Sequence, residues 1–224
     1  MSWWSKVKST VRQVVRVVVE AVNRLTLGFA DLLLGFVAWP RKKLRLHIVV
    51  LADANGPLVS DADLVPAIEY VTRIFKDRFN VNVVPYGRSM VQAMKDPAPA
   101  AVLDIECGWE AWKADFGEVG DFFAKHLAGW NAIPISATFP VTVYVVRNIT
   151  GTKGCSLGPL TDFIVVDRDG IAVASTMAHE IGHACGLWHS RTQSNLMYHP
   201  DNRGDRVKWF QKNLLRSSRH VQFW

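Results

Sequence analysis

Apolar residues recur along the chain in two periods, and together they predict a sheet covered by helices. Short runs rich in branched residues predict strands at 44–52, 81–84, 101–105, 141–149 and 162–166. The last two runs are the most apolar and are typical of buried strands. Because the strands alternate with helical segments, we expect a mixed, mostly parallel sheet.

Helical spacing predicts three helices. The first follows Ser60 or Asp61 and runs to about residue 78, with an inner side formed by Leu64, Val65, Ile68, Val71 and Ile74. The second covers residues 173–187, where Ser175 or Thr176 can cap or join the first turn. The third covers residues 205–219, with a basic outer face and an inner side formed by Val207, Phe210, Leu214 and Leu215. An insertion at 106–140 is rich in aromatic residues, which we expect in the core.

The first 40 residues have a pattern of their own. Polar residues recur every four positions and would form one stripe of a helix, with valines opposite them: Lys8, Arg12, Arg16, Glu20 and Arg24. Residues 25–39 are almost wholly apolar, but fifteen helical residues span only about 22 Å of a hydrocarbon core of ~30 Å. No small-residue cleavage site follows them, so no clear cleavable signal peptide is predicted.

We interpret residues 1–43, the arm, as an amphipathic segment that lies in a membrane interface, and we expect a membrane-associated or secreted protein. The candidate membrane contacts are Trp3, Trp4, Arg12, Arg16, Phe29, Phe36 and Trp39. Three alternatives stay open. The arm can pack on the rest of the chain or on a partner, it can serve as a delivery leader, or it can be a true span or signal.

Charge divides the chain in a similar way. The net charge of +6 combines nine basic and two acidic residues in 1–45, eleven basic and sixteen acidic residues in 46–200, and six basic and two acidic residues in 201–224. No nucleic-acid-binding motif accompanies the basic ends, so we expect no nucleic-acid partner. An anionic lipid surface is the partner that a basic arm fits.

The strongest chemical signal is the segment HEIGHACGLWH at residues 179–189. His179 and His183 are one helical turn apart, so both imidazoles project from one face and can bind one metal ion. Gly186 can adopt a positive φ, which lets the helix stop and the chain return His189 to the same ion. Three neutral nitrogens with one open position are the pattern of a catalytic zinc site. Glu180 can then take the proton of a zinc-bound water.

These residues resemble the metzincin clan of zinc metalloproteases, whose extended motif H-E-x-x-H-x-x-G-x-x-H is matched at every fixed position. The resemblance implies a zinc endopeptidase with one catalytic ion and a protein or peptide substrate. It also implies an α+β (α/β-like) fold with a mixed twisted sheet, long helices, an active-site helix and a small carboxy-terminal subdomain. Met197 would form the hydrophobic floor beneath the histidines, and neither Tyr198 nor His199 is assigned as a ligand.

Residues 141–167 most resemble the matrixin and pappalysin layouts of this clan. In those proteins a short antiparallel edge strand precedes the last strand and binds substrate, and its counterpart here would be residues 154–158. Cys155, Ser156 and Leu157 are therefore candidate substrate contacts, and an ordinary glycine turn is the alternative. We accordingly divide the chain into the arm, 1–43, and a catalytic domain, 44–224.

The three cysteines, Cys107, Cys155 and Cys185, leave two states open: one disulfide with a free thiol, or three free thiols. Cys185 lies inside the motif, but three histidines already supply the ligands. Two other functions compete with a peptidase. One is a different zinc hydrolase, and the other is a membrane-binding or delivered effector whose metal site is secondary, against which the intact Glu180 argues.

Overall fold

The computed structural model describes residues 41–107, 118–127 and 140–223, together with residues 11, 14, 15, 17–22, 24–26 and 29 of the arm. At its centre is β1 (Lys42–Val50), which pairs with strands on both of its sides. Its partners are β4 (Val81–Pro85), β5 (Val91–Ala93), β7 (Val141–Val146) and, antiparallel to it, β11 (Val221–Gln222).

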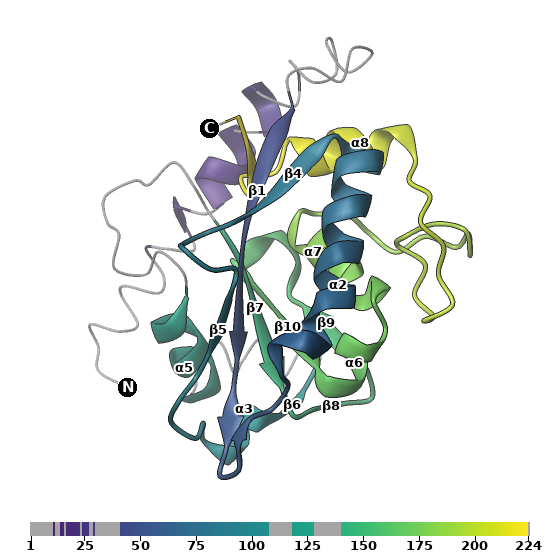
Figure 1. The fold of residues 1–224 in the computed structure, drawn as a ribbon. Helices are drawn as coiled ribbons and strands as arrows, with labels where there is room; N and C mark the ends of the chain where they lie inside the picture. Colours follow the sequence, from purple (N-terminus) through teal and green to yellow (C-terminus); the bar gives the residue numbers. More distant parts are fainter. Residues whose placement is uncertain are drawn as a thin grey trace.

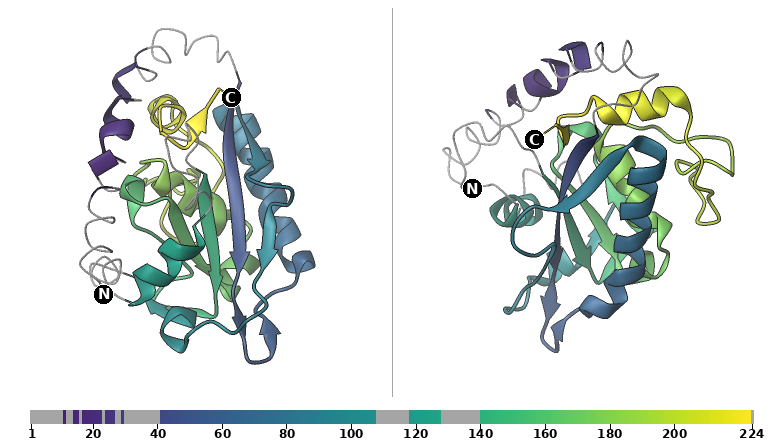
Figure 2. Two further views of the ribbon diagram at one scale, coloured as in Figure 1. Left: turned by 90° about the vertical axis from the view of Figure 1, so that its left-hand side faces the viewer. Right: turned by 45° about the horizontal axis from the view of Figure 1, so that its top comes forward.

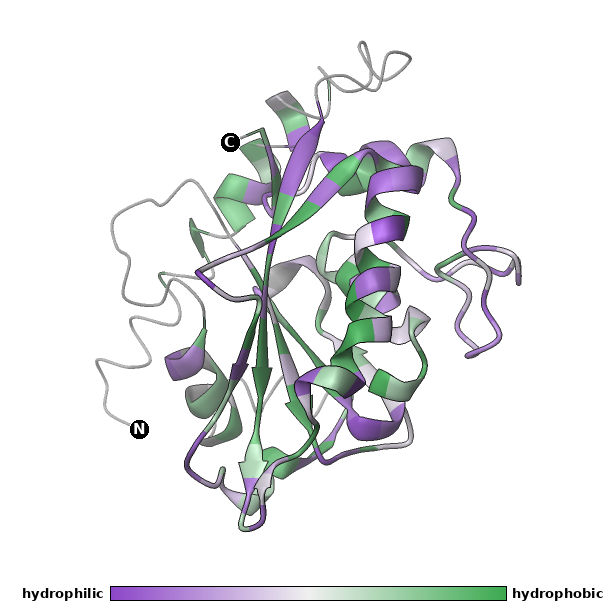
Figure 3. Ribbon diagram, in the orientation of Figure 1, coloured by the Kyte–Doolittle hydropathy of each residue, from purple (hydrophilic) through white to green (hydrophobic). Residues whose placement is uncertain are grey.

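The sheet continues from β1 through β7 to the strands that border the site. β10 (Phe163–Asp167) is parallel to β7, and β9 (Gly154–Ser156) is antiparallel to β10 at the edge. Figure 3 shows that β7 and β10 are mostly hydrophobic, and both strands are buried along their length. The predicted mixed, mostly parallel sheet is confirmed.

Two small ladders flank the main sheet. They pair β2 (Ala52–Asp53) with β3 (Gly56–Pro57) and β6 (Asp104–Glu106) with β8 (Asn148–Thr150). The prediction of one strand at 101–105 was wrong, because α3 (Ala100–Leu103) precedes β6 there. The carbonyl of Pro99 accepts hydrogen bonds from the N–H groups of Val102 and Leu103 and so begins that helical turn.

The first predicted helix is confirmed as α2 (Asp61–Ile74), which begins with a capping box. The Asp63 N–H donates to Ser60 Oγ at 3.3 Å, and the Ser60 N–H donates to the Asp63 carboxylate at 2.8 Å. A π-helical turn, η1 (Phe75–Phe79), continues it. Val65 is 47% exposed, contrary to the prediction, because the inner face passes through Ala67 instead.

The remaining helices are α5 (Glu118–His126), η2 (Gly158–Leu160), α6 (Arg168–Ala172), α7 (Ser175–Ala184) and α8 (Trp209–Arg216). α2 contacts α6 and α7, and α5 lies on the opposite side of the sheet from α2 (Figures 1 and 2). Phe123 of α5 is buried against Tyr144, whose hydroxyl donates to the Phe123 carbonyl at 2.5 Å. The other aromatics of the insertion, except Phe122, lie outside the described residues.

Two expectations about the carboxy-terminal helix were wrong. Phe210 is 48% exposed, and Gln211 takes the inward position beside Leu215. The basic residues at its end do not form a solvated face either, because Arg216 and Arg219 are both buried. Arg219 lies between two carboxylates: its Nη2 is 2.6 Å from Asp162 Oδ1, and its Nη1 is 3.3 Å from Glu20 Oε2.

Glu20 and Arg24 attach the arm to the rest of the chain. The Glu20 carboxylate accepts from the N–H of Arg219 at 3.1 Å, and Arg24 donates to the carbonyls of Leu214 and Cys185, both at 3.2 Å. Figure 2 shows the described part of the arm next to this carboxy-terminal segment. At these two positions, the polar stripe of the arm that we placed in a membrane interface therefore packs on the chain itself.

The apolar stripe of the arm faces away from the domain. Its exposed members are Val11, Val14, Val15, Val18, Val22, Leu25 and Phe29. Among the described residues, no helix combines the length and the apolar character needed to cross a bilayer.

We expect Arg219→Met to lower the free energy of unfolding by about 3–5 kcal/mol, because it removes the fully buried cation that Glu20 and Asp162 share. Urea unfolding followed by tryptophan fluorescence measures this change. Arg88→Met, at an exposed arginine, is the matched control and should change the free energy by less than about 0.5 kcal/mol. Equal effects of the two substitutions would contradict the assignment.

Candidate metal centre and active-site cleft

Two histidines project from one face of α7 toward the same point. The Nδ1–H of His179 donates to the carbonyl of Leu196 at 2.9 Å, and that of His183 donates to the carbonyl of Leu187 at 2.7 Å. A carbonyl can only accept, so each Nδ1 carries the proton. Each neutral ring therefore presents the lone pair of its Nε2 to the other.

The end of α7 returns the third histidine to this point. The Leu187 N–H donates to the Gly182 carbonyl at 2.9 Å, and the Gly186 N–H donates to the His183 carbonyl at 2.8 Å. These two bonds form a Schellman motif, whose left-handed position is Gly186 with φ of 86°. The predicted positive φ at Gly186 is thereby confirmed. Beyond the turn, His189 Nε2 lies 3.0 Å from His183 Nε2.

The three Nε2 atoms fit a single cation. In the described part of the chain, these histidines form the one group of potential ligands close enough to hold a metal ion, within 4.8 Å of one another. His179 Nε2 and His183 Nε2 are 3.1 Å apart, and neither carries a proton to share. Two ligands of a tetrahedral zinc, each about 2.0–2.1 Å from the ion, lie about 3.3 Å apart. A zinc ion would remove the repulsion between the lone pairs.

Burial keeps these rings neutral. Desolvation lowers the pKa of His179 to about 3 and that of His183 to about 4, and it also lowers the pKa of the less buried His189. At neutral pH all three rings therefore offer a lone pair to a metal ion.

Glu180 packs against the edge strand β9. A β-carbon on Gly154 would lie 2.7 Å from Glu180 Cγ, so only glycine leaves room for this side chain. Burial raises the pKa of Glu180 to about 8, and the charge of Arg203 opposes the rise. A cation at the histidines would oppose it as well and would favour the carboxylate form, which can accept a proton.

Met197 is fully buried beneath α7. A β-carbon on Gly182 would lie 2.6 Å from Met197 Sδ, so helix and methionine are in direct contact. Asn195 shapes the turn: its Oδ1 accepts from the Met197 N–H and its Nδ2 donates to Gln211 Oε1, both at 2.9 Å. Sequence reasoning missed Asn195 and Gln211, because two separated amides form no recognisable pattern.

A cleft of about 790 Å³ contains these groups. It is lined by residues 148–156, by the three histidines and Glu180, and by His199, Pro200, Asp201 and Arg203. Of the candidate substrate contacts, Cys155 and Ser156 lie in β9 and line the cleft at a sheet edge, whereas Leu157, which directly follows β9, is not part of the lining. Their role in substrate binding stays a prediction.

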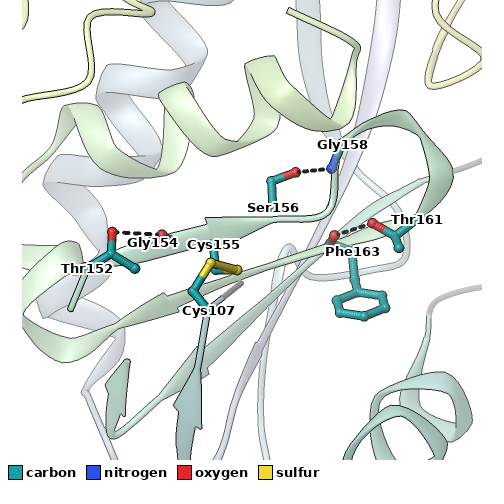
Figure 4. Close-up of a disulfide and its surroundings, with 8 residues drawn as sticks. All are labelled: Cys107, Thr152, Gly154, Cys155, Ser156, Gly158, Thr161 and Phe163. Atoms are coloured by element: carbon teal, nitrogen blue, oxygen red, sulfur yellow. Dashed lines mark hydrogen bonds between the residues drawn. A yellow bond between two sulfur atoms is a disulfide. The ribbon is translucent and has the colours of Figure 1, made fainter. Parts of the chain in front are cut away.

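The cysteines adopt the first of the two predicted states. Cys107 and Cys155 form a disulfide that ties β9 to the residue that follows β6 (Figure 4). Cys185 is a buried free thiol, and burial raises its pKa to about 12, which disfavours the thiolate that a metal would bind. The ring of the exposed His199 lies 4.9 Å from that of His189 but is not part of the metal-binding group.

The remaining candidate residues belong to the arm. Phe29 is 61% exposed. The others lie outside the described residues: Trp3, Trp4, Arg12, Arg16, Phe36 and Trp39. The division of the chain at residue 43 also stays a prediction.

Comparison with known proteins agrees with this geometry. The matrixin family model matches residues 92–209, more than half of the chain. Mirolysin in complex with compound 9 has a TM-score of 0.55 at 15% identity, over 78% of this chain and 90% of that one. Mature mirolysin of Tannerella forsythia in complex with a cleaved peptide has a TM-score of 0.53 at 12% identity, over 79% and 91%. These likenesses concern the fold. None of the curated proteins compared with the chain matches it.

We expect Gly154→Ala to displace Glu180 while leaving the histidines in place. Peptide hydrolysis should fall about 100-fold in kcat/KM, since a shift of about 1 Å in a catalytic group has an effect of this size. Zinc content, measured by atomic absorption, should stay at one ion per chain. Gly87→Ala, where a β-carbon meets open space, is the control. Unchanged kcat/KM in Gly154→Ala would contradict the packing argument.

Proposed function

Because the chain belongs to the matrixin family and is a zinc metallopeptidase, we propose that it is an endopeptidase that cleaves extended protein segments at a membrane surface. The observation that carries the chemistry is the convergence of three neutral Nε2 atoms next to a buried carboxylate at a sheet edge. His179, His183 and His189 hold the zinc ion.

The chain's own residues supply the proton transfers. When bound, zinc polarises the scissile carbonyl and lowers the pKa of the attacking water. Glu180 accepts the proton of that water and then donates it to the nitrogen of the leaving amine. Its contact with Gly154 keeps the carboxylate at the edge strand, beside which a peptide backbone would lie.

The edge strand β9 supports the choice of an extended substrate. A strand with its outer side unpaired can bind another backbone in any sequence through main-chain hydrogen bonds. β9 is tied down by the Cys107–Cys155 disulfide and borders the cleft. A structural relative, mirolysin, has been solved with a cleaved peptide.

Glu180→Gln should lower kcat by about 100- to 10,000-fold while the zinc content stays at one ion per chain, since the amide keeps the shape but cannot accept the proton. His183→Ala should lose both zinc and activity. Hydrolysis of a quenched fluorescent peptide and metal analysis of the same samples distinguish the two. Glu180→Gln with undiminished kcat would exclude this residue as the base.

The orientation of the arm supports membrane binding. Its polar residues Glu20 and Arg24 contact the domain, and the valines of its apolar stripe are each about half exposed. An amphipathic helix with a covered polar side and an exposed apolar side suits the boundary between headgroups and acyl chains. The disulfide supports an exported or membrane-associated location, because disulfides persist in oxidising compartments.

The same contacts favour a second interpretation of the arm. Arg24 donates to the carbonyl of Cys185 next to Gly186, at the turn that positions His189. The arm would then be a packing or delivery leader that supports the catalytic domain. Liposome binding separates the two interpretations.

We expect the double substitution Val14→Asp and Val18→Asp to lower flotation with phosphatidylserine-containing liposomes at least tenfold, because each carboxylate must otherwise be desolvated in the lipid. Val65→Asp, at a valine of similar exposure on α2, is the matched control and should float like the parent protein. A parent protein that stays with the soluble fraction at low salt would favour the packing or delivery interpretation.

A further inference from the structure

Arg203 is a charged residue of the cleft for which the mechanism above has no use. It follows the Met197 turn and lines the same cleft as Glu180 and the three histidines. Its side chain is only 4% exposed, whereas that of Asp201 beside it is 45% exposed. A buried guanidinium loses its hydration and requires hydrogen-bond partners for its N–H groups.

The partners of Arg203 hold it in one orientation but do not use all of its donors. Nε donates to the carbonyl of Pro200 and Nη2 to the carbonyl of His199, both at 3.2 Å. Nη2 also lies 3.3 Å from Asp201 Oδ1. Nη1 is buried and has no hydrogen-bond partner in the described structure. The guanidinium is therefore preorganised, with one donor group left for a ligand.

The cleft around Arg203 holds charges of both signs: Lys153 lies beside Asp201, and Asp167, Asp169 and Glu180 are also in the lining. Asp201 is shared, since its other oxygen binds Lys153 Nζ at 2.8 Å, so one carboxylate faces two cations. Arg203, Glu180 and the three histidines line the same cleft, and the charge of Arg203 lowers the pKa of Glu180. A guanidinium N–H group binds a carboxylate better than a neutral acceptor, and a ligand bound at Nη1 would share this cleft with the three histidines.

We infer that Arg203 binds a carboxylate of the substrate beside the scissile bond through Nη1, and so makes the enzyme selective for acidic substrates. The carboxylate can belong to a Glu or Asp side chain or to the carboxy terminus of a short substrate. Charge-assisted hydrogen bonds to a planar guanidinium are the strongest that a carboxylate makes in proteins. The inference rests on the peptidase function proposed above.

The test is a panel of quenched fluorescent peptides cleaved by the zinc-loaded full chain. Glu is placed in turn at each position next to the scissile bond and compared with Gln, and each peptide is made with a free and an amidated carboxy terminus. We expect one Glu peptide, or one free-carboxylate peptide, to exceed its neutral partner about 10- to 100-fold in kcat/KM. The pair that shows this ratio identifies the source of the carboxylate.

Variants then assign the ratio to Arg203. Arg203→Met should bring the ratio of acidic to neutral peptides to about one, and Arg203→Lys should keep part of it. Lys153→Met, at an exposed lysine of the same cleft, should keep the ratio. Binding of the Glu and Gln peptides to the uncleaving Glu180→Gln variant, measured by calorimetry, should show the same preference.

Each outcome is decisive. No carboxylate preference in the parent enzyme overturns the inference, as does an equal loss for acidic and neutral peptides in Arg203→Met, which would mean that Arg203 only braces its own loop. If Lys153→Met lowers the ratio of acidic to neutral peptides as much as Arg203→Met does, the preference comes from the overall electrostatic potential of the cleft and not from direct contact with Arg203. If Arg203→Met does not fold, the inference is tested by the ratio of acidic to neutral peptides in the parent enzyme and by its partial loss in Arg203→Lys. A chain that cleaves no peptide refutes the proposed function instead.

Discussion

Two backbone carbonyl groups, those of Leu187 and Leu196, determine what the centre of this protein can do. Each accepts the Nδ1 proton of a buried histidine, which fixes the ring and leaves the Nε2 lone pair facing its neighbour. Without these carbonyls the rings could rotate or exchange tautomers, and the closely spaced nitrogens would form hydrogen bonds with one another. With them, a cation is the partner that satisfies all the lone pairs. Both carbonyls belong to turns, so the turns at Gly186 and Met197 are as much a part of the site as the histidines.

The groups that surround the cleft are also held in fixed positions by contacts that are buried away from water. Gly154 gives Glu180 its space, Asn195 and Gln211 hold the methionine turn, and the disulfide fixes the edge strand. Arg203 is held as firmly as these groups, but its contacts leave one donor free. A buried, preorganised donor group in the same cleft as Glu180 is better explained by a ligand than by stability, because an unpaired buried donor is destabilising.

The two sides of the arm have different surroundings. Its polar side meets buried partners such as Arg219, which also pairs with Asp162, and its apolar side remains about half exposed. Amphipathic periodicity was visible in the sequence, but it fixes only which residues share a face. Which face of the arm packs on the protein depends on Asp162 and Arg219, more than a hundred residues away in the sequence. The basic composition of the carboxy terminus gave no sign that its arginines, Arg216 and Arg219, are buried.

The sequence by itself determined the three converging histidines, the glutamate next to the first of them, the positive φ at Gly186 and the main strands, because each follows from local geometry: helical period, strand burial and glycine freedom. It could not determine that Val65 and Phe210 face outward, that Cys107 pairs with Cys155, or that Asn195 binds Gln211. The tertiary structure decided these points, together with the role of Arg24 and the setting of Arg203. All of them depend on contacts between distant segments, where desolvation and partner geometry outweigh the preference of any single stretch of chain.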